Sequence, residues 1–497
     1  MDLNPEERVR NIDMGAAHLN RHIMPVQVEN LERLGCGLKS WKGDVRAFGI
    51  LDRGPSVRSK SRNPRTEDPR SSNLELARIL PLDGSVSTLT PSRLDREIDE
   101  LASISAYPAP AVTRVLFSPE DLAARQWLTA LAKDSGFHIR ADPAGNLFIR
   151  WEGSEPCLPA IATGSHTDAI PNAGKYDGVV GVLGGLEAIR QLKEAGHVPK
   201  RSIELIMFTA EEPTRFGIGC LGSRLMAGTT SPDEARALRD AEGRSLDELR
   251  DAAGCRGDLG AVKLSTGAYQ AFIELHIEQG PLLEAEEIDI GVVEKIAAPS
   301  AFRLLLKGTG GHAGAVLMKD RRDALLAAAE VALLVEKAAL ESGSPDTVGT
   351  TGLVEVKPGT INSIPCDVKM EVDFRDTDRE ARDKALARIG DGTHAICKRR
   401  GIEIDWQVIN QDPPALCDPS LVALVESKAA AAGLSHRRMI SRAYHDSLFM
   451  ARVCPMTMIF IPCFKGYSHR PDEFSSPEAI DKGVAVLKAC LEELSLR

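Results

Sequence analysis

Apolar runs typical of buried strands alternate with segments of helical periodicity over residues 93–297. The segment 158–166 is expected to be a buried strand, and 201–212 is expected to be another strand. Helices are expected at 92–104, 118–137 and 178–196. Strands that alternate with helices predict an α/β domain built on a mixed, largely parallel sheet.

Capping and turn signals mark several of these elements. Ser92 is a candidate N-cap for the first helix, and Ser118 with Asp121 fits a capping box in which Asp replaces the usual Glu. The segment 138–151 is typical of a hairpin whose turn lies at 143–145. These local signals agree with the alternation of strands and helices.

A second unit is expected at residues 298–408. Its pattern predicts the order strand, helix, strand, strand, helix, strand, which is the βαββαβ plan of ferredoxin-like domains. Residues 409–497 contain further α/β elements and a last helix at 477–495. Because that helix needs a sheet to cover, we expect 409–497 to complete the domain begun at 93–297.

Composition excludes several classes of protein. The chain has 497 residues, of which 43% are hydrophobic and 27% charged, which is typical of globular proteins and atypical of disordered or collagen-like ones. It contains no apolar run long enough to span a membrane. With 61 Lys and Arg against 71 Asp and Glu, the formal net charge is −10, so neither nucleic acid nor a membrane is an expected partner.

Residues 1–92 are expected to be an N-terminal extension that is partly disordered, because 52–74 are polar and interrupted by prolines. That segment carries six basic residues but no interleaved aromatic residue, so a linker is a better interpretation than a nucleic-acid patch. The first residues offer no secretory signal, and none of the ten cysteines forms a CxxC pair. We therefore expect reduced thiols and an intracellular, cytoplasmic location.

Histidine and carboxylate side chains follow apolar, strand-like runs at five places. They are His166, Asp177, the pair Glu211 and Glu212, His276, and His469. Because the ligand crevices of open α/β sheets lie at the carboxyl ends of strands, we expect these side chains at one edge of the sheet. Each alone is more typical of a structural histidine or a solvated turn, but the joint pattern indicates a metal site.

Imidazole and carboxylate ligands without thiolates suit Zn²⁺ or Mn²⁺. Two metal ions that share one aspartate can polarise a carbonyl and activate a water molecule. One glutamate must then stay off the metals and move protons as a general acid and base. If strand geometry continued through Glu211 and Glu212, they would point in opposite directions, so that one could ligate while the other faced the water differently.

Eight motifs together resemble the amidase/carbamoylase branch of the dinuclear metallopeptidase superfamily. They are GSHTDAIPNAGKYDGVVGVLGGLEAI, EEPTRFG, ELHIEQGPLLE, GTGGHAG, NSIP, DFRDTD, YHDSLFMA and GYSHRPDE, within residues 95–495. Members of this branch include N-carbamoyl-L-amino-acid hydrolases, allantoate amidohydrolases and ureidoglycolate amidohydrolases. The motifs are most similar to those of the plant-type ureidoglycolate amidohydrolases.

The resemblance implies two divalent metal ions in each subunit, with Mn²⁺ favoured over Zn²⁺. The implied ligands are His166 and His276 for one ion, Glu212 and His469 for the other, and Asp177 as the bridge between them. Asp168 would orient His166 without touching the metal, as metal-binding imidazoles generally require. Glu211 would be the general acid and base.

The resemblance also implies that the unit at 298–408 is a lid and homodimerisation domain. The implied substrate-binding residues are Glu211, Glu212, His276, Gln279, His312, Asn362, Arg375, Tyr444 and His445, of which Glu211 and His312 are also catalytic. Asn362 and His312 can donate to a developing oxyanion, and the planar fork of Arg375 matches a carboxylate. Alternatively, Arg375 forms a surface ion pair with Asp373 or Asp376.

The expected substrate is a small molecule with a ureido group and a carboxylate. Relatives that act on allantoate or carbamoyl amino acids carry small residues where this chain has Arg442-Ala443-Tyr444, so Tyr444 fills part of the pocket. The implied reaction hydrolyses (S)-ureidoglycolate to glyoxylate, ammonia and carbon dioxide in purine catabolism. Glu211 would take the proton of the attacking water and deliver it to the leaving nitrogen.

Three alternatives stay open. The chain could perform the same chemistry on allantoate or an N-carbamoyl-L-amino acid. It could instead be a peptidase or an aminoacylase, although ELHIEQG is typical of the amidase branch. It could also be an inactive relative that serves as a binding or scaffold protein, although every expected ligand position is filled.

Overall fold

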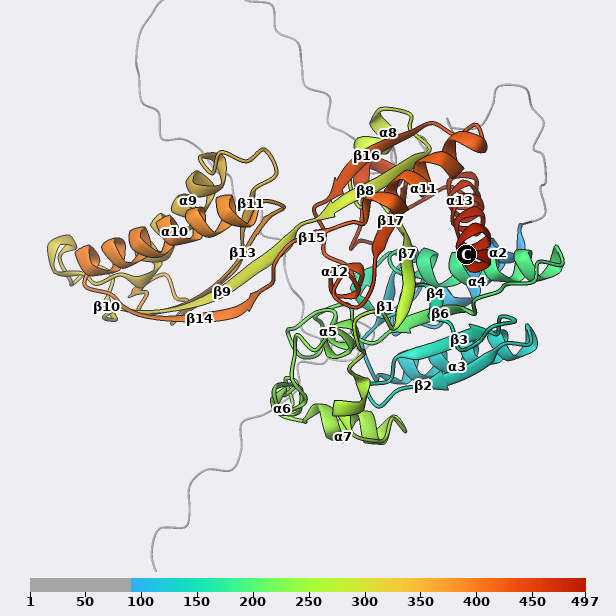
Figure 1. The fold of residues 1–497 in the computed structure, drawn as a ribbon. Coiled ribbons are helices and arrows are strands. Elements are labelled where there is room, and N and C mark those ends of the chain that lie inside the picture. The colour runs from blue at the N-terminus through green and yellow to red at the C-terminus, as the bar shows by residue number, and fades with distance from the viewer. Residues whose placement is uncertain (1–90) are drawn as a thin grey trace, which may run out of the picture. The chain divides into compact units, whose positions relative to one another are not determined.

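The computed structural model describes residues 91–497 (Figure 1). The N-terminal extension expected at residues 1–92 lies almost wholly outside this range, so its order and role stay predictions. Within the described residues, no helix combines the length and the apolarity that crossing a membrane requires.

A mixed sheet carries the larger part of the described chain. Its strands are β2 (His138–Ala141), β3 (Leu147–Trp151), β4 (Ala160–His166), β6 (Ile203–Phe208), β7 (Tyr269–Ile277), β8 (Ile290–Ile296), β15 (Ala415–Leu416), β16 (His436–Ser441) and β17 (Met456–Ile461). The strand order is β15-β8-β17-β7-β4-β6-β3-β2, and β16 pairs with β8. The central strands β6, β4, β7 and β17 are parallel, whereas β3 and β2 at one side and β8 and β15 at the other join antiparallel. The expectation of a mixed sheet is therefore confirmed: its parallel strands form the centre, and antiparallel pairs join at both flanks.

Helices pack against this sheet and against each other (Figure 1). They are α2 (Arg93–Ser103), α3 (Pro119–Asp134), α4 (Val179–Glu194), α5 (Leu221–Ala227), α6 (Pro232–Ala237), α7 (Leu246–Ala252), α8 (Leu282–Ala285), α11 (Pro419–Ala431), α12 (Ser447–Met450) and α13 (Pro477–Leu496). The helices α4 and α13 lie together against the central strands, so the last helix does cover the sheet that begins in the first part of the chain. The strands β1 (Val112–Arg114) and β5 (Ala169–Ala173) form a separate short antiparallel pair.

The approach of α4 to the sheet depends on glycine. A Cβ atom on Gly181 would overlap Ser165 of β4 and come too close to the carbonyl of Leu275 in β7. The helix therefore packs directly on the two strands whose ends carry His166 and His276. This close packing places the first turn of α4, and the loop before it, at the carboxyl edge of the sheet.

The helix starts largely follow the capping signals. Ser92 forms a full capping box with Asp95 at the start of α2. The Ser118 hydroxyl accepts from the Asp121 amide, but the Asp121 carboxylate accepts from the Phe117 amide and pairs with Arg125 instead of returning to Ser118. The capping box expected at α3 is therefore wrong in its second half, because a buried cation competes for the carboxylate.

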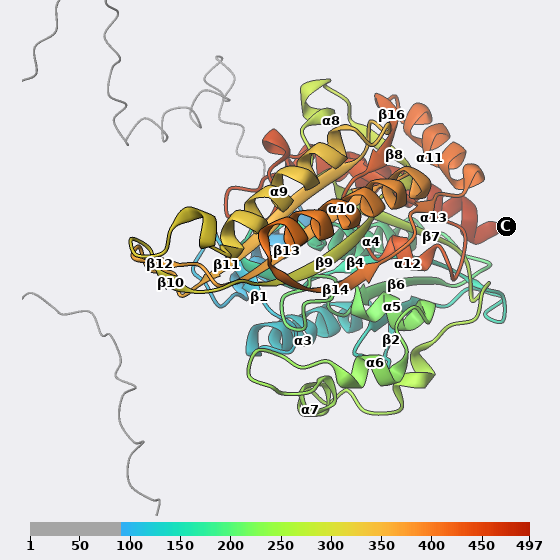
Figure 2. The ribbon, with the colours of Figure 1, turned by 90° about the vertical axis from the view of Figure 1, so that its left-hand side faces the viewer.

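A second sheet with its own apolar core lies between these parts in sequence. Its elements are β9 (Ala298–Lys307), α9 (Ala324–Leu340), β11 (Val348–Lys357), β13 (Asp367–Asp376), α10 (Arg379–Arg400) and β14 (Glu403–Gln411). The strand order is β11-β13-β9-β14 with antiparallel neighbours, and α9 and α10 pack side by side on the sheet (Figure 2). The short strands β10 (Gly311–His312) and β12 (Ser363–Ile364) pair with each other. Pro365 lies between β12 and β13, and it cannot continue the ladder because proline has no amide hydrogen.

Candidate metal centre

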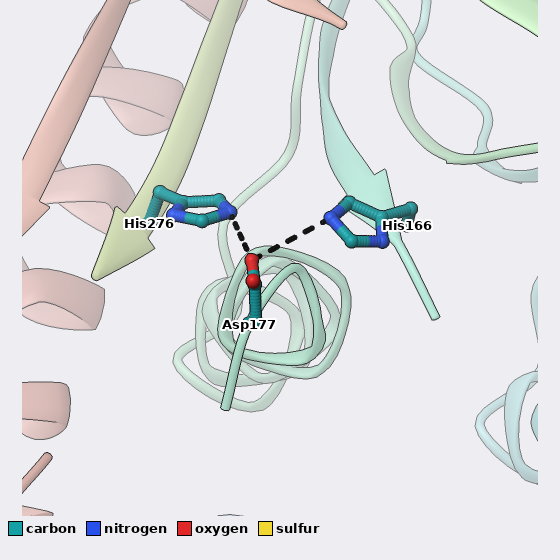
Figure 3. A group of neighbouring side chains, drawn as sticks. All are labelled: His166, Asp177 and His276. Carbon is teal, nitrogen blue, oxygen red and sulfur yellow. Dashed lines mark ion pairs between the residues drawn. The ribbon is translucent and has the colours of Figure 1, made fainter. Parts of the chain in front are cut away.

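The carboxylate of Asp177 lies at the centre of the histidine and carboxylate cluster. Its Oδ1 is 3.2 Å from Nε2 of His276 and 3.7 Å from Nε2 of His166 (Figure 3). Its Oδ2 is 3.2 Å from Nε2 of His469, which is itself 3.4 Å from Oε1 of Glu212. The structure thus forms two groups of possible metal ligands that share Asp177, each with its ligand atoms within 4.8 Å of one another.

The parallel centre of the sheet explains why these residues meet. His166 is the last residue of β4, and His276 lies one residue before the end of its neighbour β7. Asp177 precedes the first turn of α4, which rests on the same two strands. His469 comes from the loop that follows β17, the next parallel strand. Each ligand therefore comes from the carboxyl edge of the sheet, as the sequence pattern predicts.

The glutamate pair is positioned differently from the expectation. The strand β6 ends at Phe208, and Ala210 has a φ of 53°, so Glu211 and Glu212 lie in a loop beyond the strand. Strand alternation therefore does not separate their roles, and that part of the prediction is wrong. Glu212 reaches His469, whereas Oε2 of Glu211 is 3.6 Å from Nε2 of His166.

Asp168 contacts both parts of the cluster through different atoms. Its main-chain carbonyl accepts from Nδ1 of His166 at 3.0 Å, whereas its carboxylate is 3.7 Å from that nitrogen, which is too long for a hydrogen bond. The carboxylate instead accepts from the amides of Glu211 and Glu212 at 3.4 and 3.0 Å. Asp168 thus orients the ring with its backbone and the glutamate loop with its side chain.

The donor set fits divalent metal ions. The Nδ1 atoms of His166 and His276 donate to main-chain carbonyls, of Asp168 and Ile277, which leaves both Nε2 atoms facing Asp177. Such outer hydrogen bonds fix the tautomer and the ring plane of metal-binding histidines. The ligand atoms are imidazole nitrogens and carboxylate oxygens, which suit Mn²⁺ and Zn²⁺.

The charges of the cluster are those of a cation site. Burial disfavours the charged ring of His276, but the hydrogen bond and charge of Asp177 outweigh it and raise its pKa to about 9. The hydrogen bond from His469 to Asp177 likewise raises the pKa of His469 to about 9. Burial and the charge of Asp177 raise the pKa of Glu212 to about 8. In the metal-free protein, protons on these side chains therefore balance the negative charge of the buried carboxylates. Bound divalent cations would balance the same charge.

Gln279 and His445 lie beside the ligands, as the resemblance implies. Nε2 of Gln279 donates to Oδ2 of Asp177 at 2.9 Å. The ring of His445 is buried with its centroid 4.5 Å from that of His276, and its Nε2 is 3.0 Å from the hydroxyl of Ser441. Both side chains are therefore close enough to shape the space around one ligand group.

Arg375 and Tyr444 lie together, but Arg375 has a partner of its own. Its guanidinium forms two hydrogen bonds of 2.7 Å with the carboxylate of Asp373, which is one of the two ion pairs considered as its alternative role. The guanidinium carbon lies 5.2 Å from the centroid of the Tyr444 ring. The fork of Arg375 is thus occupied, although its position beside Tyr444 matches a place at the pocket.

His312 and Asn362 lie in a separate place. Both are exposed, and the amide of Ala313 donates to the carbonyl of Asn362, which brings the two residues side by side next to the β10–β12 pair. Among residues 91–497, no hydrogen bond or ion pair joins either side chain to the ligand groups. A single chain therefore does not bring these two expected site residues to the cluster.

Comparison with known proteins agrees with this arrangement. Residues 162–493 match the sequence profile of Peptidase family M20/M25/M40. The chain belongs to this family. It is 55% identical over 411 residues to a ureidoglycolate hydrolase of Oryza sativa subsp. japonica, covering 81% of this chain and 84% of the relative. It is 53% identical over 411 residues to a ureidoglycolate hydrolase of Arabidopsis thaliana, covering 81% and 86%.

Solved structures show the same likeness. Crystal structures of AtUAH in complex with glyoxylate and with (S)-hydroxyglycine each superpose with a TM-score of 0.77 at 53% identity, covering 81% of this chain and 97% of theirs. The M20/M25/M40 protein described here is therefore a metal-dependent hydrolase of amide bonds, and the resemblance found from its motifs is confirmed.

Sequence reasoning missed two residues of this M20/M25/M40 site. The Ser468 hydroxyl is 3.0 Å from Oδ2 of Asp177 and 3.0 Å from Oε2 of Glu473, and Glu473 also accepts from the amides of Tyr176 and Asp177. Both residues belong to the GYSHRPDE motif around His469. The signal available was the motif itself, since metal ligands are generally held by polar residues that do not touch the metal.

Proposed function

We propose that the protein is a dinuclear metal-dependent amidohydrolase that cleaves (S)-ureidoglycolate to glyoxylate, ammonia and carbon dioxide. Hydrolysis of the ureido group consumes one water, releases the terminal nitrogen as ammonia and the carbonyl carbon as carbon dioxide, and leaves hydroxyglycine. Hydroxyglycine then yields glyoxylate when it loses a second ammonia. These are the two ligands of the AtUAH structures. The observation that carries the proposal is the pair of ligand groups joined by Asp177, in a chain 55% identical to a ureidoglycolate hydrolase.

Two metal ions, Mn²⁺ in preference to Zn²⁺, are assigned to the two groups. His166 and His276 hold one ion, Glu212 and His469 hold the other, and Asp177 bridges them. The support is that each oxygen of Asp177 faces a different group, with Oδ1 toward His276 and Oδ2 toward His469. Bound divalent ions in such a pair polarise a carbonyl oxygen and lower the pKa of water.

Glu211 is assigned as the group that moves protons. Burial, together with the charge of Glu212, raises its pKa well above the usual range of a carboxyl group. Its backbone is fixed by the Asp168 carboxylate, and its Oε2 lies beside the His166 ring. A carboxylate with a raised pKa can accept a proton from water at one side and return it to the leaving nitrogen at the other.

Tyr444 is assigned as the residue that keeps the pocket small. It is half-buried, and a Cβ atom on Gly219 would overlap its hydroxyl, so the ring fills the space beside the Glu211 loop. A filled pocket rejects substrates longer than ureidoglycolate. Arg375, whose guanidinium lies next to this ring, binds the substrate carboxylate when it exchanges or shares its partner Asp373.

The βαββαβ segment between β9 and β14 is assigned as a ferredoxin-like lid through which two chains dimerise. Leu326, Leu333 and Leu340 repeat every seven residues along α9 and are 40%, 66% and 82% exposed. The neighbouring strand β11 is an edge of its sheet, with its ladder groups free on one side. A second copy that covers this apolar edge would bring exposed His312 and Asn362 to the site of its partner.

Release of ammonia tests the proposed reaction. The Mn²⁺-reconstituted protein is incubated with equal concentrations of (S)-ureidoglycolate, allantoate and an N-carbamoyl-L-amino acid, and Glu211→Gln serves as the inactive control. We expect a strong preference for ureidoglycolate in the parent and a relative gain on allantoate in Tyr444→Gly. A parental preference for allantoate or the carbamoyl substrate would keep the metal chemistry and overturn the substrate assignment.

A further inference from the structure

A buried carboxylate outside the ligand groups holds the backbone next to Asp177. Glu473 is 4% exposed, and its Oε1 accepts from the amides of Tyr176 and Asp177 at 2.8 and 3.1 Å. These amides belong to a loop almost 300 positions earlier in the chain. A Cβ atom on Gly174 in that loop would overlap the Glu473 side chain, so glycine is needed for the approach.

The other oxygen of Glu473 reaches Asp177 through one hydroxyl. Oγ of Ser468 lies 3.0 Å from Oε2 of Glu473 and 3.0 Å from Oδ2 of Asp177, and it accepts from Nε2 of Gln279 at 3.1 Å. A hydroxyl carries one hydrogen, so it can donate to one carboxylate at a time while accepting from an amide. Glu473 therefore binds the amide of Asp177 directly, and the Ser468 hydroxyl that it contacts also contacts Oδ2 of Asp177.

The same contacts tie two ligand-bearing loops together. Ser468 and Glu473 flank His469, whose Nε2 is 3.2 Å from Oδ2 of Asp177. The loop of Tyr176 and Asp177 comes from the other side of the cluster and leads into α4. A carboxylate that bridges two ions must direct its two oxygens to opposite sides, so rotation of Asp177 or displacement of either loop would spoil both ligand groups.

A purely structural role for Glu473 makes a different prediction. A buried carboxylate near the start of α4 could serve only to satisfy free amides and the positive end of the helix dipole. Its loss would then lower the stability of the metal-free protein. The affinity for both ions would fall only as a consequence of that lower stability. Metal affinity measured in a folded variant separates the two roles.

We infer that Glu473, through Ser468 and the amides of Tyr176 and Asp177, is a positioning residue that fixes the bridging carboxylate between the two metal ions. The inference rests on the metal assignment of the proposed function and adds to it a residue that contacts neither the ions nor the substrate. It also explains why the motif around His469 carries a half-buried serine on one side of the ligand and a buried glutamate on the other.

Titration of the metal-free protein with Mn²⁺ tests this inference, with free Mn²⁺ followed by electron paramagnetic resonance. Glu473→Gln retains the size of the side chain and an oxygen for the two amides, but it removes the charge and the acceptor for Ser468. We expect Glu473→Gln to weaken Mn²⁺ binding by about 10- to 100-fold, with Ser468→Ala weakening it in the same direction. The melting temperature of the metal-free protein is expected to stay at the parental value.

Glu478→Gln is the matched control, because Glu478 lies five positions further on with an exposed side chain paired to Lys482. Two Mn²⁺ ions bound by Glu473→Gln as tightly as by the parent would overturn the inference and leave the proposed function intact. Weak binding that accompanies an equal loss of metal-free stability would also overturn it in favour of the structural role. A parent that binds no Mn²⁺ would overturn the metal assignment and this inference together.

Discussion

The expected site residues of the two sheets differ in burial and in whether they contact one another. At the carboxyl edge of the large sheet, His166, Asp177 and His276 are buried and already face one another. In the smaller unit, His312 and Asn362 are exposed and point to no ligand group of the same chain. The residues of the large sheet meet within one chain because parallel strands bring them to one edge. The residues of the smaller unit need either closure of the lid or a second copy of the chain to reach the ligand groups.

The largest effect is expected from the glutamate pair of the large sheet. Glu211→Gln should lower kcat by about 10²–10⁴-fold, because an amide cannot take the proton of water. Glu212→Gln should lower activity by a different route, through loss of a ligand beside His469. Steady-state kinetics together with metal analysis by mass spectrometry separate the two.

The informative readout for this pair is the number of bound ions. Glu211→Gln should keep two ions per chain, whereas Glu212→Gln should keep fewer. The matched substitution in an exposed glutamate, Glu478→Gln in α13, should change neither. Loss of metal from Glu211→Gln to the same extent as from Glu212→Gln would contradict the separate roles.

The next effect concerns the smaller unit. His312→Ala should lower kcat/KM by about 10²–10³-fold, the cost of removing one oxyanion donor, while metal content and melting temperature stay parental. The His312 side chain is exposed and accepts one hydrogen bond, from the Gly314 amide, so its loss should cost little folding stability. Activity unchanged in His312→Ala would show that this residue is not part of the site.

Mixing two inactive variants shows whether His312 acts across a dimer. A heterodimer of Glu211→Gln and His312→Ala chains retains one site with both residues intact if His312 comes from the partner. Denaturing and refolding an equal mixture should then restore about one quarter of the parental sites. If His312 served its own chain, every site in the mixture would lack one of the two residues, and no activity would return.

The candidate metal centre could be predicted from the sequence because its histidines follow neighbouring strands and Asp177 precedes a helix that packs on those strands. Parallel neighbours end at the same edge of a sheet, so the sequence alone predicts that His166, His276 and Asp177 lie together. The order of strands and helices could be predicted for the same reason, since apolar runs and helix caps are local signals. The resemblance in the motifs added the expected assignment of ligands to each ion.

Other features depended on contacts that local patterns do not carry. The loop conformation of Glu211 and Glu212 follows from the positive φ of Ala210 and from the distant Asp168 carboxylate. The pairing of Arg375 with Asp373 depends on which carboxylate lies closest in the folded sheet. The support of Asp177 by Glu473 joins residues almost 300 positions apart, a separation at which spacing has no predictive value.

Binding of metal should release protons from His276 and His469 at the edge of the large sheet. In the metal-free protein, the pKa values of His276 and His469 are both about 9, so both rings hold a proton at neutral pH. Metal ligands must be deprotonated, so the metal-free state binds more protons than the metal-bound state, and affinity should rise with pH up to about 9. Each released proton corresponds to about tenfold in affinity per pH unit.

Calorimetric titration in buffers with different heats of ionisation measures the released protons directly. His469→Asn should release fewer protons than the parent. His197→Asn is the matched control, because His197 pairs with Ser495 away from the cluster. Equal proton release from the parent and His469→Asn, or affinity that does not change between pH 6 and 9, would contradict the titration of these rings.

The smallest effects are expected from ion pairs that touch neither site, and they sharpen the contrast between the two units. Arg190 and Glu97 pair in the large unit with side chains only 6% and 9% exposed, whereas Glu330 pairs in the smaller unit with Arg399 and Arg400, all three at least 28% exposed. Glu97→Ala leaves the buried guanidinium of Arg190 with only Ser135 and a longer pair of 3.8 Å to Glu187, and should lower the free energy of unfolding by up to about 3–5 kcal/mol. Glu330→Ala should lower it by at most about 1 kcal/mol, because water screens these partly exposed pairs. Urea denaturation of the metal-free variants measures both values.

If removing Arg190 as well, in Glu97→Met with Arg190→Met, restores most of the lost stability, the cost belongs to the unpaired charge and not to the pair itself. Equal losses in Glu97→Ala and Glu330→Ala would contradict the difference in burial on which the contrast rests.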